Sequence, residues 1–82
     1  MSTLTVTDAR AAVTDAVRAI VPDADFDTLD HDESMREAFE LDSLDFLSFV
    51  EGLSTRTGIR IEESDYPQLT TMTDCVEFLT GA

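Results

Sequence analysis

Residues 41–59 read LDSLDFLSFVEGLSTRTGI, and this stretch decides the fold. Its apolar residues recur at helical spacing, which predicts a helix over residues 43–57. Asp42 and Ser43 are both residue types that cap a helix N-terminus. Gly58 suits the left-handed conformation that commonly follows a helix, and we expect Ile59 to cover the last turn in a Schellman-type contact. Both ends of this helix are therefore marked in the sequence.

Three further helical segments are predicted, one before this stretch and two after it. In chain order they cover residues 8–21, 62–66 and 71–79. We expect Thr7 and Thr71 to cap the first and the last of them. Pro22 disfavours continuation of the first helix, and Pro67 closes the short one. The sequence predicts an all-α fold, a small four-helix bundle of three longer helices and one short helix, as a single domain over residues 1–82.

A long first loop, residues 22–41, separates the first two longer helices and is rich in aspartate. Loops of this length are uncommon in small domains unless part of them is ordered or functional. We expect residues 34–40 to form a helical turn. Phe26, Leu29 and Phe39 are expected to plug the open end of the bundle and to fasten the loop to the core.

The composition narrows the classes of partner. Eighteen acidic residues stand against five basic ones, so the formal net charge is −13 over 82 residues. Such a surface repels nucleic acid and anionic membranes and attracts basic protein surfaces, although acidic residues also serve solubility alone. A single cysteine allows no internal disulfide. This, and the absence of an evident signal peptide or apolar span, predict a cytoplasmic protein. We expect a monomer, and the acidic charge predicts no nucleic-acid or membrane partner.

Ser43 carries the main functional signal. A serine hydroxyl at a helix N-terminus, between Asp42 and Asp45, can be esterified by a phosphate. The positive end of the helix dipole favours negative charge at that place. The alternative is that Asp42 or Ser43 only caps the helix.

The string Asp42-Ser43-Leu44-Asp45, at the start of the second of four helices, resembles the attachment motif of acyl carrier proteins. The likeness extends over nearly the whole chain and includes the long loop, the exit after Gly58, the acidic short helix and the last helix. It implies a 4'-phosphopantetheine group on Ser43, transferred from coenzyme A by a phosphopantetheinyl transferase with Mg²⁺, and with Asp42 close to that metal. The chain would then carry acyl thioesters in fatty-acid, polyketide or related specialised-metabolite biosynthesis and would not itself be an enzyme.

The resemblance also implies a docking face for acyl-transferring or condensing enzymes with basic patches. The residues it assigns to this face are Leu44, Asp45, Leu47, Glu51, Glu62 and Glu63. The alternative for the two leucines is that they pack under the first loop.

The chain departs from the family pattern near the motif. Glu40 and Leu41 stand where many members carry a glycine and a small residue, and Ser48 and Glu51 also differ from common choices. These departures concern partner preference. Gly52, inside the same helix, leaves room either for a sequestered acyl chain or for close helix–helix packing.

Other candidate sites have weaker support. Asp23, Asp25 and Asp27 open a calcium-loop pattern, but Thr28 and Ser34 replace the glycine and the glutamate that it requires. Ser43, His31 and a nearby aspartate would make a hydrolase triad, although no nucleophile elbow surrounds the serine. We expect Cys75 to be a buried small hydrophobe. The competing function is an acidic protein-interaction module that mimics nucleic acid or blocks a basic partner and carries no prosthetic group.

Overall fold

Helices make up the regular structure of the chain. The structure is a computed structural model that describes residues 4–30 and 32–81, and no strand occurs in these residues. In chain order the elements are α1 (Val6–Arg18), α2 (Met35–Ala38), α3 (Ser43–Thr57), the 3₁₀ helix η1 (Glu63–Leu69) and α4 (Met72–Gly81). The predicted all-α bundle is confirmed at this level, with α2 as an additional short helix within the long loop.

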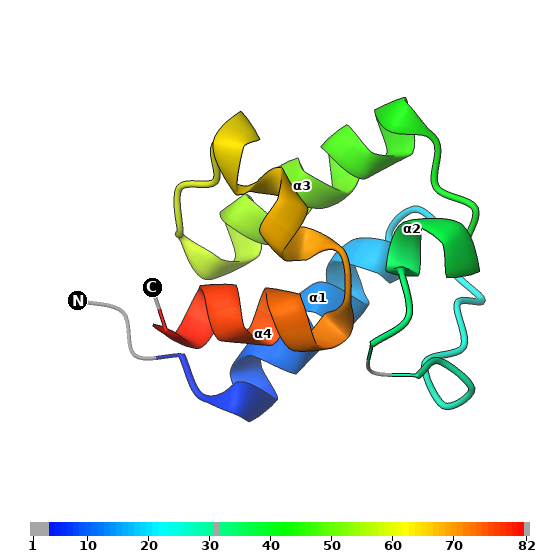
Figure 1. Cartoon of the computed structure of the whole chain (residues 1–82), viewed down its shortest axis with the longest axis horizontal. Coiled ribbons are helices and arrows are strands. Elements are labelled where there is room, and N and C mark those ends of the chain that lie inside the picture. The colour runs from blue at the N-terminus through cyan, green and yellow to red at the C-terminus, as the bar shows by residue number, and fades with distance from the viewer. Residues whose placement is uncertain (1–3, 31, 82) are drawn as a thin grey trace.

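The helices pack around α1. It contacts both α3 and α4, and η1 lies against α4. The long loop and α2 cover one end of this arrangement (Figure 1). No helix in residues 4–30 and 32–81 combines the length and the apolarity that a membrane span requires.

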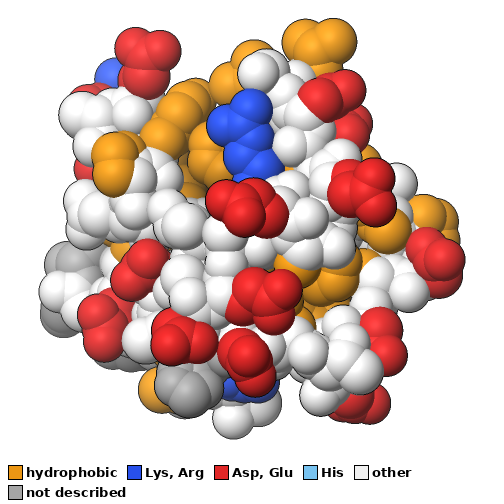
Figure 2. Space-filling view, turned by 45° about the vertical axis from the view of Figure 1, so that its right-hand side comes forward, with side chains coloured by type: hydrophobic (Ala, Val, Ile, Leu, Met, Phe, Trp, Pro, Cys, Tyr) orange, Lys and Arg blue, Asp and Glu red, His pale blue; other side chains and the backbone are white. Residues whose placement is uncertain are grey.

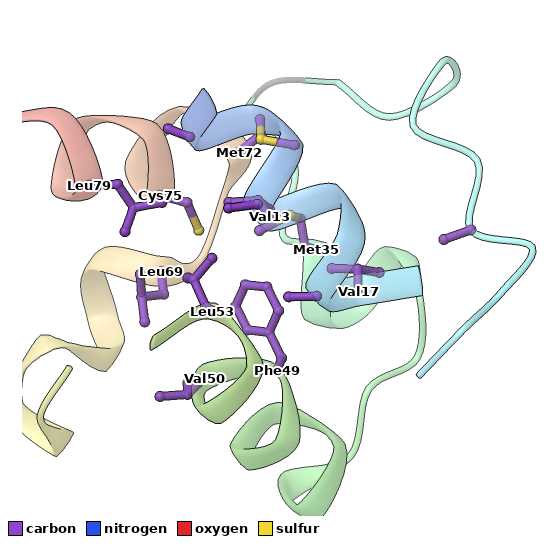
Figure 3. Packing of buried hydrophobic residues seen from close by; sticks show 14 residues of the cluster. Val13, Val17, Met35, Phe49, Val50, Leu53, Leu69, Met72, Cys75 and Leu79 are labelled. Atoms are coloured by element: carbon purple, nitrogen blue, oxygen red, sulfur yellow. The ribbon is translucent and has the colours of Figure 1, made fainter. Parts of the chain in front are cut away.

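One apolar cluster holds the helices together. Figure 3 shows Phe49 and Leu53 of α3 pointing toward Val13 and Val17 of α1. Phe49 is 1% exposed and is the largest fully buried side chain. The buried members that the figure labels on the remaining helices are Met35, Leu69, Met72, Cys75 and Leu79. The middle and second half of α3 are thereby fixed to the core along one side.

Both ends of α3 lie where the sequence predicts them. The Gly58 N–H donates to the Ser54 carbonyl at 2.8 Å, and Gly58 has a left-handed φ of 72°. This single bond is the αL motif, so the helix does not end in the hydrogen-bond pattern of a Schellman motif. The Ile59 N–H instead donates to Thr57 Oγ1 at 3.2 Å, while the Ile59 side chain is half-buried against the core.

The predicted start of α1 is wrong by two residues. Thr5, not Thr7, is the cap, and its Oγ1 accepts a hydrogen bond from the Asp8 N–H at 3.0 Å. The helix ends at Arg18, and a turn carries the chain on to Pro22. With Thr5 as the cap, an acidic residue, Asp8, lies three positions after the cap, which is the capping-box spacing.

The short helix near residue 65 is longer than predicted. Pro67 lies inside η1, which continues to Leu69. Proline interrupts an α-helix, but its fixed φ falls within the range of a 3₁₀ helix. The buried Leu69 at the end of η1 gains core contacts from this continuation. The predicted cap of α4 is confirmed, because the Asp74 N–H donates to Thr71 Oγ1 at 3.0 Å.

Parts of the long loop are ordered, as predicted. Residues 34–40 contain α2, capped by the Ser34 hydroxyl, which accepts from the Glu37 N–H at 3.3 Å. The rings of Phe26 and Phe39 pack with their centroids 5.0 Å apart. Both rings pack against the core cluster, and so does Leu29.

Gly52 marks a close approach between two helices. A Cβ placed on Gly52 would lie 3.7 Å from the Cβ of Ala16 in α1. This is ordinary van der Waals contact, so the backbones of α3 and α1 approach closely at this point. The geometry favours the packing interpretation of this glycine over a space reserved for an acyl chain.

Candidate functional site

Two aspartates hold the start of α3 in a reciprocal capping arrangement. The Asp45 N–H donates to Asp42 Oδ1 at 2.8 Å, and the Asp42 N–H donates to Asp45 Oδ2 at 3.4 Å. Such a box satisfies N–H groups that the first helical turn would otherwise leave without partners. Because Asp42 is the cap, the hydroxyl of Ser43 is not needed for this purpose.

The side chain of Ser43 lies at the first position of α3 and is exposed. Its Oγ accepts a hydrogen bond from Nη2 of Arg36 at 3.1 Å. The hydroxyl proton remains available for donation or removal, so the oxygen is chemically accessible to an external reagent. Sequence reasoning left open which residue caps the helix, and the structure assigns the cap to Asp42.

Arg36 is a site residue that the sequence analysis missed. Its Nε donates to the Leu41 carbonyl at 3.2 Å, and its guanidinium carbon lies 5.5 Å from the centroid of the Phe46 ring. Cation–π and hydrogen-bond contacts together fix an otherwise flexible side chain beside Ser43. Arg36 lies seven positions before Ser43, and no local motif in the sequence indicates the contact.

A tight turn after α2 brings Arg36 to Ser43. The Leu41 N–H donates to the Arg36 carbonyl at 2.8 Å, and the Glu40 N–H donates to the Glu37 carbonyl at 3.3 Å. These two bonds form a Schellman motif, whose left-handed position glycine usually occupies. Glu40 occupies it here with φ 56°. The buried side chain of Leu41 completes the turn.

We expect Glu40→Gly to stabilise the fold by about 0.5 kcal/mol. A left-handed non-glycine residue costs roughly 1–2 kcal/mol, and added backbone freedom in the unfolded chain offsets about 0.5–1 kcal/mol of the gain. Urea unfolding followed by circular dichroism measures the difference. Glu40→Gln is the matched control, since it removes the same charge and keeps the strain. An equal gain in both variants would show that charge repulsion, and not backbone strain, is relieved.

An apolar groove opens beside Arg36. Phe46, Tyr66 and Leu69 line a volume of about 300 Å³ between α3 and η1, and Arg36 contributes to its wall. The rings of Phe46 and Tyr66 meet edge to face with centroids 5.3 Å apart. Arg36 therefore contacts both the groove and Ser43.

The outer face of α3 exposes large apolar side chains. Leu44 is 75% exposed and Leu47 is 43% exposed, so the alternative in which Leu44 packs under the first loop is wrong. Glu51, one turn beyond Leu47, is also exposed and borders a surface hollow with Ile61 and Tyr66. Aliphatic and acidic groups are thus presented together on one helix face.

The other acidic residues predicted for docking differ in their surroundings. Asp45 is half-buried and takes part in the capping box, so it has a structural role at the start of α3. Glu62 and Glu63 are exposed at the start of η1. Glu62 pairs with Arg60, with Nε and Oε2 3.1 Å apart, on a well-exposed surface. Surface pairs of this kind contribute little to stability.

The remaining candidates do not form a site within the described chain. Cys75 is buried, as predicted, and burial, with a smaller contribution from Asp74, raises the pKa of its thiol from 9.0 to about 12. The thiol is therefore protonated at neutral pH and a poor nucleophile. Across residues 4–30 and 32–81, no three carboxylate, thiol or imidazole side chains gather as a metal site. His31 lies outside the described residues.

Figure 2 shows acidic side chains spread over the face it presents, with few basic ones among them and apolar atoms exposed between. This agrees with the net charge of −13. Searches of protein-family models, of curated proteins and of solved structures found no match to the chain. Its function is therefore inferred from its own residues.

Proposed function

We propose that this protein is an acyl carrier protein that carries 4'-phosphopantetheine on Ser43. One observation carries the proposal. The hydroxyl of Ser43 is exposed at the first position of α3, while Asp42 takes over the capping role. A serine whose only role was to cap the helix N-terminus would accept the capping hydrogen bond with its own side-chain oxygen. The four-residue string around it and the acidic helical fold support the same function.

The residues at the site suit the attachment chemistry. Ser43 Oγ forms a bond to the phosphorus of the pantetheine phosphate in coenzyme A, as the bond from that phosphorus to the leaving adenosine 3',5'-diphosphate breaks. The hydroxyl proton passes to a base of the transferase. The carboxylate of Asp42 is exposed beside Ser43 and is a suitable ligand for Mg²⁺ supplied with the reaction. Once bound, the group supplies a thiol that carries acyl chains as thioesters.

The exposed face of α3 suits transient enzyme docking. Leu44 and Leu47 provide apolar contact, and Glu51 provides charge for a basic partner. Large exposed apolar side chains rimmed by polar groups are typical of interaction sites. Phosphopantetheinyl transferase and the acyl-transferring or condensing enzymes would bind this face in turn, and charge would steer their approach.

The test is an intact mass before and after incubation with a promiscuous phosphopantetheinyl transferase, coenzyme A and Mg²⁺. We expect a gain of one phosphopantetheine, located on Ser43 by fragmentation. The competing function, an acidic interaction module without a prosthetic group, predicts no gain. Absence of a gain on folded protein whose starting mass shows it to be unmodified would contradict the carrier proposal.

We expect Leu44→Ala to lower kcat/KM for this loading reaction about tenfold. Burying an aliphatic side chain in an interface is worth about 1.5–3 kcal/mol, and tenfold corresponds to about 1.4 kcal/mol. The measurement is the initial rate of loading at limiting carrier concentration.

Val6→Ala is the matched control for Leu44→Ala. Val6 is 57% exposed at the start of α1 and lies outside the proposed docking face. The Val6→Ala variant should be loaded at the same rate as the unmodified chain. Equal rates for the two variants would show that Leu44 takes no part in docking. Because both side chains are exposed, neither variant is expected to change the urea midpoint appreciably.

A further inference from the structure

The guanidinium of Arg36 is held beside Ser43 by three contacts. Nη2 reaches Ser43 Oγ at 3.1 Å, Nε reaches the Leu41 carbonyl at 3.2 Å, and the guanidinium carbon lies 5.5 Å from the Phe46 ring centroid. The last two contacts orient the side chain. The first directs one of its N–H groups at the single atom on which the proposed modification would occur.

Arg36 is a cation without an anionic partner in the described structure. Within residues 4–30 and 32–81, the one ion pair closer than 4.0 Å joins Arg60 and Glu62. In a chain of net charge −13, this leaves the guanidinium of Arg36 bonded only to neutral oxygens, a carbonyl and a hydroxyl. Hydrogen bonds from arginine to an ionised acceptor are roughly twice as strong as neutral ones. A negative group on Ser43 would give the guanidinium of Arg36 the anionic partner that it lacks.

We propose that Arg36 binds the phosphate of the group attached to Ser43. The inference rests on the proposed function, because that function places a phosphodiester on this oxygen. The nonbridging oxygens then lie two bonds beyond Oγ, through the phosphorus, and the N–H groups of Arg36 pair with them in place of the hydroxyl. The planar guanidinium fork matches phosphate geometry.

The contact has two consequences. It offsets the repulsion between the phosphate and the carboxylates of Asp42 and Asp45 on the same turn. It also holds the base of the arm beside the groove lined by Phe46, Tyr66 and Leu69, since Arg36 belongs to the wall of that groove. Arg36 is therefore a positioning residue that limits the directions in which the arm can leave the protein.

Arg18 is a close internal control, because it makes the same two orienting contacts at another place. Its Nε donates to the Ala24 carbonyl at 3.3 Å, and its guanidinium carbon lies 5.6 Å from the Phe26 ring centroid. An arginine that only closes a turn and covers a ring would behave like Arg18. Arg36 differs by its additional hydrogen bond to Ser43.

The test uses the full chain with phosphoserine placed at position 43 by semisynthesis, so that it does not depend on the transferase. The second ionisation of a phosphomonoester has a pKa near 6, and ³¹P NMR follows it. A neighbouring cation favours the doubly charged form and lowers this pKa. We expect Arg36→Gln to raise the phosphoserine pKa by about 0.5 units or more, Arg36→Lys to restore part of the difference, and Arg18→Gln to leave it unchanged.

A second measurement needs no substitution. In the phosphorylated chain, the side-chain N–H resonances of Arg36 should shift with the same midpoint as the phosphorus signal, while those of Arg18 stay in place. Equal phosphoserine pKa values with and without the Arg36→Gln change, or Arg36 resonances that ignore the titration, would overturn the inference. A chain that fails to accept phosphopantetheine can still pass this test, and a chain that is loaded can fail it.

Discussion

Replacing Ser43 with alanine is expected to abolish loading completely, with no phosphopantetheine gained at any enzyme concentration that fully loads the unmodified chain. The reason is chemical, because alanine has no oxygen to form the phosphate ester. The variant should remain folded, since the cap of α3 is the carboxylate of Asp42 and not the hydroxyl of Ser43. Intact mass measures the loading, and circular dichroism measures the helix content.

Ser48→Ala is the matched control for this prediction. Ser48 is an exposed serine on α3, and the Ser48→Ala variant should be loaded like the unmodified chain. A gain of mass on Ser43→Ala would place the attachment at another hydroxyl and contradict the site. Asp42→Ala is expected to lose about 1 kcal/mol of stability through loss of the cap, and also to load more slowly, because its carboxylate is the proposed ligand for Mg²⁺.

The limits of α3 could be predicted because the chemistry at both of its ends is local. Asp42 and Asp45 satisfy the first turn within four residues, and Gly58 supplies the left-handed conformation at the other end. The start of α1 was predicted two residues late, because Thr5 and Thr7 are equally good caps by residue type. The discriminating signal was available, since only Thr5 has an acidic residue three positions later at Asp8.

The contact between Arg36 and Ser43 could not be predicted from sequence. It depends on the left-handed conformation of Glu40, which is a residue type that rarely adopts it. Sequence reasoning noted Glu40 as a departure from a glycine pattern but had no means of placing the side chains on either side of the turn. The continuation of η1 past Pro67 was missed for a related reason, because proline stops an α-helix but not a short 3₁₀ helix.

Phe49→Ala is expected to have the largest effect on stability, a loss of about 3–5 kcal/mol. Phe49 is 1% exposed and lies among residues of α1, η1 and α4 in the core cluster. A domain of this size has a total stability of only about 4–12 kcal/mol, so this one truncation removes a large share of it. The measurement is the free energy of unfolding from urea titrations followed by circular dichroism.

The comparison with Leu47→Ala separates burial from helix propensity. Leu47 lies on the same helix but is 43% exposed, so its truncation should cost well under half as much as that of Phe49. If Phe49→Ala is already unfolded in buffer, Phe49→Leu gives the graded value, expected at about 1–1.5 kcal/mol. Equal midpoints for Phe49→Ala and Leu47→Ala would contradict the packing described.

A chain of contacts links Phe49 to Arg36. The ring centroids of Phe49 and Phe46 lie 6.0 Å apart, and the guanidinium of Arg36 lies over the Phe46 ring. Because of this chain of contacts, core loosening at Phe49 should also release the arginine from Ser43, and its side-chain N–H resonances should broaden or shift in Phe49→Leu.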